Sequence, residues 1–177
     1  MGDGEGGFTL LEVLVVMVLL GVMLTLSVFA LKVFWQRRAL DGSTKQVTAQ
    51  LRQLQQRAVA ESHPLIYGAR FTQGSSTYTL LRYNPSDPSP PLCREMETLT
   101  LEAGVKVAEG TSFGSSPYIN LSECGSFGAG DHFLFFFARG TATGGTLYLT
   151  NEQLKDTSQD TTRISVTNLT GRVGGGY

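Results

Sequence analysis

The feature that most constrains this chain is an apolar stretch, residues 8–31, that contains a single ionisable side chain, Glu12. As an α-helix, these roughly 24 residues are about 36 Å long, enough to cross a hydrocarbon core of about 30 Å with some tilt. A charge at hydrocarbon depth costs roughly 2.5–3.5 kcal/mol, so an intramembrane carboxylate indicates a function by default. The sequence therefore predicts a transmembrane helix with a functional Glu12 near its start.

Two simpler interpretations account for this stretch less well. A secretory signal peptide has a basic start, an apolar region of about 7–15 residues and then a small-residue cleavage site. Here the apolar part is longer, and the small residue, Gly7, precedes it. An ordinary single-pass anchor tolerates Glu12 near one interface, but it leaves the order Gly-Phe-Thr-Leu-Leu-Glu at residues 7–12 unexplained.

This junction resembles the type III signal of type IV pilins and pseudopilins. The resemblance implies that a prepilin peptidase cleaves after Gly7 and that Phe8 becomes the methylated N-terminus. Glu12 matches the carboxylate of the family motif. The freed amine of Phe8 is a natural partner for Glu12, within one chain or between subunits, and such a pair is a plausible register device for a filament.

The charges around the span bear on its orientation. The leader, residues 1–7, carries Asp3 and Glu5 and no Lys or Arg, whereas leaders of the family are usually basic. The basic residues near the span all lie on its C-terminal side: Lys32, Arg37 and Arg38. The positive-inside rule places that side in the cytoplasm. We expect the opposite orientation, with the globular domain outside the cytoplasm, because the distal part has the features of an exported domain.

The helical pattern continues beyond the membrane, because no proline occurs before Pro64. Apolar residues recur at spacings of seven, four, three and four, which makes one stripe: Leu40, Val47, Leu51, Leu54 and Ala58. We predict one helix over about residues 9–61, ending before Pro64, because the residue before a proline disfavours helical geometry. Gly42 is a candidate soft point or kink.

Short β-rich runs separated by turn residues follow Pro64. The predicted strands are 65–71, 77–83, 97–107, 118–121, 132–138, 146–150 and 163–168. The run 133–137 is continuously apolar and is typical of a central strand that is covered on both faces. A long helix followed by an antiparallel sheet predicts an α+β fold. The predicted parts are a leader (1–7), a transmembrane helix (8–31), its amphipathic continuation (32–62) and a β-rich pilin domain (63–177).

The distal half resembles minor pilins of the GspH/FimT type in three segments: 135–140, 144–149 and 164–173. The resemblance implies a long helix packed on antiparallel sheets, in a low-abundance subunit that primes or caps a filament. It also implies a bacterial envelope protein anchored by one span in the inner membrane. The implied partners are other pilin or pseudopilin subunits, the prepilin peptidase, the inner-membrane assembly platform and membrane lipid. The alternative within the class is a minor pseudopilin of type II secretion.

Two cysteines, Cys93 and Cys124, both lie in the distal part. An even count in an exported domain suggests one disulfide, and two buried free thiols are the alternative. His63 and His132 are about 70 residues apart in the chain, and no spacing suggests a metal site. We expect no catalytic residue, no cofactor and no enzymatic activity.

DNA is a further candidate partner, because some FimT-like members bind it during natural transformation. A DNA-binding surface needs several Lys or Arg side chains to neutralise phosphates. From Pro64 onward the chain has eight Lys and Arg against ten Asp and Glu, and it ends in Gly-Gly-Gly-Tyr without further cations. The candidate contacts are Arg139, Arg163 and Arg172. We expect weak binding, and the alternative function of another class is a membrane-tethered DNA receptor.

Overall fold

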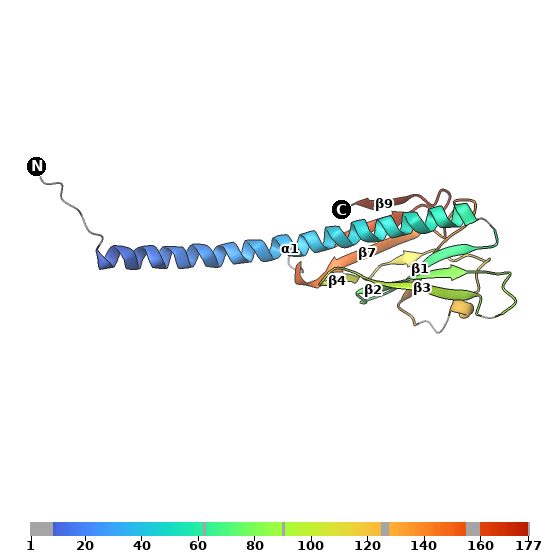
Figure 1. Cartoon of the computed structure of the whole chain (residues 1–177), viewed down its shortest axis with the longest axis horizontal. Helices are drawn as coiled ribbons and strands as arrows, with labels where there is room; N and C mark the ends of the chain where they lie inside the picture. The colour runs from blue at the N-terminus through green and yellow to red at the C-terminus, as the bar shows by residue number, and fades with distance from the viewer. Residues whose placement is uncertain (1–8, 62, 90, 125–127, 155–159, 177) are drawn as a thin grey trace, which may run out of the picture. The chain divides into compact units, whose positions relative to one another are not determined.

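The computed structural model (Figure 1) describes residues 9–61, 63–89, 91–124, 128–154 and 160–176. The chain divides into two compact units, residues 1–35 and residues 36–177. One helix, α1 (Leu10–Glu61), contributes its first part to the first unit and its remainder to the second. The predicted helix over residues 9–61 is confirmed.

In the first unit, the apolar side chains of α1 have no protein around them. The large hydrophobic side chains from Leu10 to Val28 are between 47% and 84% exposed. By length and composition, this part of α1 is apolar enough to cross a membrane. A continuous apolar surface of this size is not stable in water, so this part of the helix requires lipid or other helices around it.

In the second unit, α1 is amphipathic and contributes to a core. The five residues of the predicted stripe are each no more than 2% exposed: Leu40, Val47, Leu51, Leu54 and Ala58. Their spacing keeps them on one side of the helix, and that side packs against two β-sheets. This part of α1 is therefore held by intramolecular contacts.

The helix continues without interruption through Gly42, so the structure shows no break at the predicted soft point. Close packing explains why a glycine occupies this position. The turn after the third strand approaches α1 here, and the backbone N–H of Glu102 donates to Ser43 Oγ at 2.9 Å. A Cβ at Gly42 would overlap the Glu102 carboxylate, so the absence of a side chain permits this close approach.

Two antiparallel sheets follow α1. The first has the strand order β3–β2–β1–β6 and consists of β1 (Ile66–Thr72), β2 (Thr77–Tyr83), β3 (Cys93–Thr100) and β6 (Asp131–Phe136). The second has the order β4–β7–β8–β9, with β5 also paired to β7, and consists of β4 (Val105–Val107), β5 (Ser112–Phe113), β7 (Gly145–Asn151), β8 (Thr161–Val166) and β9 (Val173–Gly176). Two short 3-10 helices are η1 (Leu121–Cys124) and η2 (Glu152–Leu154). The predicted α+β fold is confirmed.

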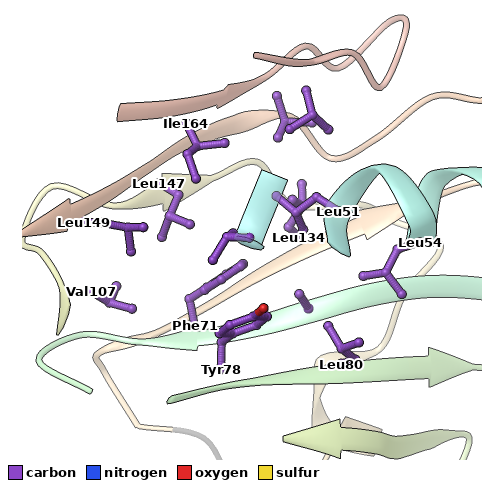
Figure 2. Packing of buried hydrophobic residues seen from close by; sticks show 14 of the residues in the cluster. Leu51, Leu54, Phe71, Tyr78, Leu80, Val107, Leu134, Leu147, Leu149 and Ile164 are labelled. Atoms are coloured by element: carbon purple, nitrogen blue, oxygen red, sulfur yellow. The ribbon is translucent and has the colours of Figure 1, made fainter. Parts of the chain in front are cut away.

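The main core lies between α1 and the inner faces of both sheets. Figure 2 shows Leu51 and Leu54 of α1 beside Leu134 of the first sheet and Leu147 and Ile164 of the second. Each of these side chains is at most 1% exposed. Full burial of one such side chain contributes about 1.5–3 kcal/mol, so this core is what holds the two sheets on the helix.

Two of the predicted strands are wrong. The run 97–107 is divided between β3 and β4, which belong to different sheets. The turn between them contains Gly104 with φ of +83°, a conformation that favours glycine and ends the extended run. The run 118–121 is not a strand; it lies in the connection that ends in η1.

The position of the phenylalanine-rich run also differs from the prediction. β6 is at the end of the first sheet rather than at its centre, although Phe133, Leu134, Phe135 and Phe136 are all buried. The main core covers Leu134 and Phe136, and a second apolar cluster covers Phe133 and Phe135. Burial on both faces therefore comes from two separate clusters. The sequence analysis did not predict β5 or β9.

Candidate processing and assembly site

The start of α1 is fixed by Thr9. The backbone N–H of Glu12 donates to Thr9 Oγ1 at 3.3 Å and to the Thr9 carbonyl at 3.0 Å. This is the geometry of an N-cap residue, whose side chain satisfies an N–H group that has no partner within the helix. A threonine followed three residues later by glutamate is the sequence pattern of a capping box. The sequence analysis missed the role of Thr9, although this spacing signals it.

Glu12 lies in the first turn of α1, where a negative charge interacts favourably with the helix dipole. Its side chain is exposed, and among the described residues it has no ion pair. The surrounding side chains of the first unit are apolar and exposed. Within the described residues, the Glu12 carboxylate therefore has no cation beside it to offset the cost of a charge in lipid.

The predicted cleavage site, Gly7 and Phe8, lies outside the described residues. The pairing of Glu12 with the freed amine of Phe8 therefore stays a prediction. The described part of the site consists of Thr9 and Glu12. Thr9 sets where the helix begins, and Glu12 places a carboxylate one turn further on.

The predicted disulfide is confirmed. Cys93 at the start of β3 is bonded to Cys124 at the end of η1, with the two Cα atoms 4.7 Å apart. Both residues belong to the second apolar cluster, on the face of the first sheet that is remote from the main core. The bond thereby holds the connection that ends in η1 over this face.

The three candidate DNA contacts are all exposed, but they do not form one cluster. The backbone segments that carry Arg139 and Arg172 come close together, because Gly171 lies against Gly140. A Cβ at Gly171, which has φ of +58°, would overlap the Gly140 carbonyl oxygen. Arg163 pairs with Gly176 in the β8–β9 ladder, four residues and about 13 Å along the strand from Arg172.

Neither histidine is part of a metal-binding cluster within the described ranges. These ranges contain no group of three or more His, Cys, Asp or Glu side chains that is placed to hold a metal ion. His132 is in β6, and His63 is in the connection between α1 and β1. The latter lines a surface groove at the end of the domain.

Known proteins resemble this chain in two respects, the sequence of its N-terminal junction and its fold. Residues 3–28 match the prokaryotic N-terminal methylation motif. Two structures of the minor pseudopilin EpsH from the type 2 secretion system of Vibrio cholerae are similar to this chain, with TM-scores of 0.53 and 0.54 and 14% identity. The similar regions cover 77% and 78% of this chain and 94% of EpsH.

The type IV minor pilin FimU of Pseudomonas aeruginosa matches with a TM-score of 0.48 and 10% identity, over 81% of this chain and 92% of FimU. No curated protein shows significant sequence similarity. The chain carries the prokaryotic N-terminal methylation motif of type IV pilins and has the fold of the minor pseudopilin EpsH, in agreement with its resemblance to the GspH/FimT type.

Proposed function

We propose that this chain is a minor subunit of a membrane-rooted filament, either a type IV pilus or a type II secretion pseudopilus. The observation that carries the proposal is the Glu12 carboxylate, which has no ion pair within the described residues. It lies one turn into a helix with exposed apolar side chains and inside a match to the methylation motif. In water, the described residues of a single subunit leave both the charge and the apolar surface without a partner. Packing of such helices side by side in a filament satisfies both.

In this proposal, the prepilin peptidase cleaves after Gly7 and the new N-terminus at Phe8 is methylated. The Glu12 carboxylate pairs with a Phe8 amine and thereby removes the cost of an isolated charge in hydrocarbon. The rest of the first unit packs in lipid before assembly and against other pilin or pseudopilin helices afterwards. The assembly platform of the inner membrane is the machine that moves the subunit between these two states.

The proposal places the globular domain outside the cytoplasm. The Cys93–Cys124 bond supports this orientation, because structural disulfides persist in oxidising compartments such as the periplasm. The basic residues after the span favour the opposite orientation. We give the disulfide more weight, because it belongs to the folded domain itself.

The role is mechanical, without a catalysed reaction. EpsH is a secretion subunit, and its similarity is consistent with a secretion pseudopilus as much as with a pilus. A part in DNA uptake rests on the exposed Arg139 and Arg172, whose backbone segments lie close together. Two cations are too few for strong phosphate binding. In a salt titration with duplex DNA, we expect affinity no tighter than about 10⁻⁴–10⁻⁶ M at physiological salt, with a shallower salt dependence for Arg172→Ala.

The assembly proposal is tested with Glu12→Gln, which keeps the size of the side chain and removes its charge. We expect this variant to insert and be cleaved normally but to be depleted from sheared filaments. Glu109→Gln, the same change at an exposed carboxylate of the second unit, is the matched control and should assemble like the unaltered chain. Normal incorporation of Glu12→Gln would show that the charge is not an assembly device.

A further inference from the structure

In the second unit, the side of α1 that faces away from the buried stripe carries a row of cations. Arg38, Lys45 and Arg52 are seven residues apart, so they follow one side of the helix over about 21 Å. All three side chains are exposed. We call this row, together with Asp41 between its first two members, the outer stripe.

A groove of about 400 Å³ lies beside the outer stripe, where α1 meets the second sheet. Lys45 and Arg52 line this helix–sheet groove from α1, and Thr162 of β8 and Gly175 of β9 line it from the sheet. A Cβ at Gly175 would lie 3.5 Å from Thr48 Oγ1, another lining atom. The glycine therefore leaves space between β9 and the helix.

The helix–sheet groove contains hydrogen-bond donors that are available to a partner. Thr48 Oγ1 is buried and has no hydrogen-bond partner within the described part of the chain. The Lys45 ammonium has no ion pair there. The Arg52 guanidinium donates to the Val173 carbonyl oxygen at 3.3 Å and has further N–H groups to donate. A carboxylate is the acceptor that suits a hydroxyl, an ammonium and a guanidinium together.

The charge around the outer stripe stays positive when the neighbouring elements are counted. Six cations belong to α1, β8 and the residue before β9: Arg37, Arg38, Lys45, Arg52, Arg163 and Arg172. Three carboxylates oppose them: Asp41, Asp160 before β8, and Glu102 beside Gly42. Lys106 and Glu152 pair with each other and cancel. The outer stripe therefore suits a partner that carries carboxylates.

A second copy of this chain fits the outer stripe badly. Subunits inserted in one membrane have a common orientation, so their α1 helices run parallel. Contact between two outer stripes would place like charges together, which disfavours that pairing. The apolar part of another copy, residues 10–31 of α1, has Glu12 as its only ionisable side chain and would leave most of the cations unpaired.

We propose that the outer stripe binds the corresponding helix of a different subunit of the filament. That helix carries Asp or Glu at seven-residue spacing, and one of its carboxylates occupies the helix–sheet groove between Lys45 and Arg52. Charged residues at this spacing along parallel helices determine which partners pair. The inference rests on the proposed function and names the partner at one face of the subunit.

DNA fits the outer stripe less well. Asp41 interrupts the row between Arg38 and Lys45, and its carboxylate would repel phosphates there. A helix can instead place a cation opposite Asp41 and carboxylates opposite its neighbours.

The experiment is photo-crosslinking of the full-length chain in the cells that produce it, with p-benzoylphenylalanine in place of Ala49. Ala49 is exposed and lines the helix–sheet groove between Lys45 and Arg52. We expect a crosslink to a different chain with the methylation motif, at a segment with two Asp or Glu residues seven apart. Mass spectrometry identifies this segment. The control position is Tyr118, which is 77% exposed outside the groove and should not give this product.

Charge variants then test the pairing. Lys45→Glu combined with Arg52→Glu should reduce the crosslink about tenfold or more, because it places negative charges in contact. Arg94→Glu, the same change at an exposed arginine of β3, should leave the crosslink unchanged. Replacing the two partner carboxylates by Lys should restore the crosslink to the doubly altered chain. Hydrogen exchange of the β7 and β8 amides checks that each altered chain is folded.

Several results would overturn the inference while leaving the proposed function intact. These are filaments that contain the chain but show no crosslink at position 49, a crosslink to a second copy, to DNA or to a segment without carboxylates, and a crosslink that the double charge reversal does not weaken. Absence of the unaltered chain from the filament fraction would overturn the proposed function and the inference with it.

Discussion

The two parts of α1 belong to one continuous helix and yet are stabilised in opposite ways. From Leu10 to Val28 the large apolar side chains cover all sides and are exposed. In the second unit the apolar residues are confined to one stripe, from Leu40 to Ala58, that is buried against the sheets. Helix formation is common to both parts, and the distribution of apolar residues determines what surrounds each of them.

This difference shows which contacts are internal to the subunit. The second part of α1 has its partners within its own chain, so its substitutions should act on folding. The first part has no such partners and carries the processing motif and Glu12, so its substitutions should act on insertion and assembly. Each prediction below tests this division.

The largest expected effect is that of a core truncation. Leu51 is fully buried, and Leu51→Ala should reduce the free energy of unfolding by about 2–5 kcal/mol through lost apolar contact and a residual cavity. Leu19→Ala removes the same atoms from an exposed position and should leave the domain unchanged. Hydrogen exchange of the β7 and β8 amides in the full-length chain measures both. Equal destabilisation by the two variants would contradict the division.

The disulfide should give the next largest effect. Its loop spans a separation of 31 residues, and replacement of both cysteines by serine should cost about 2–4 kcal/mol of domain stability. The loss should appear first as faster hydrogen exchange in the η1 connection and in β3. The first part of α1 should not respond. If two freely alkylated thiols were found in oxidised, folded protein, the bond and the export argument would both be wrong.

The cap at Thr9 should have a smaller and local effect. Thr9→Val keeps the shape and removes the oxygen that accepts from the Glu12 N–H, which should cost about 1 kcal/mol. Exchange of the first-turn amides should increase while the β-strand amides stay protected. Thr25→Val is the matched control, because the Thr25 hydroxyl donates to the Gly21 carbonyl in the helix interior and caps nothing. Identical first-turn exchange in all three chains would exclude the capping role.

The smallest expected effect at neutral pH is that of Tyr78→Phe. The Tyr78 side chain is 1% exposed, and its hydroxyl has no partner within the described part of the chain. Removing a buried, unsatisfied hydroxyl should change stability by less than about 1 kcal/mol, in the stabilising direction. A destabilisation of several kcal/mol would show that the hydroxyl has a partner.

The same substitution should change the alkaline pH dependence of stability. Burial, together with the charge of Glu97, raises the pKa of Tyr78 to about 12 from 10.0. The folded state thus keeps a proton that the unfolded state releases, and the unaltered chain should lose stability as the pH rises from about 10 to about 12. Tyr78→Phe should lose less over this range, as measured by denaturant unfolding at each pH.

The sequence predicted α1 well because its signals are local and repeated. The length of the apolar run, the missing prolines and the stripe from Leu40 to Ala58 all indicate the same helix. The strands were predicted less well because apolarity does not determine the position of a strand in a sheet. The burial of Phe135 was correctly expected, but it depends on a cluster with Cys93 and Cys124 that only the tertiary fold assembles.

The parts of the site with a local sequence signal were predicted. The parts that depend on contacts between distant segments were not. Glu12 stood out as the single charge in an apolar run, and the disulfide followed from the even number of cysteines. The approach of the segments that carry Arg139 and Arg172 depends on contact between Gly140 and Gly171, which are distant in sequence. The surface groove at the end of the domain has the same origin, because its lining residues come from five connections that are far apart in the sequence.

The most direct test of the central claim, that the first part of α1 is processed and assembled while the second part folds the domain, is the intact mass of the chain purified from membranes. The account predicts a chain that begins at Phe8, lacks residues 1–7 and carries one additional methyl group at its N-terminus. Gly7→Arg should yield only the full precursor, with the domain folded as before. A mature N-terminus at any other residue, or an uncleaved chain found in filaments, would contradict the account.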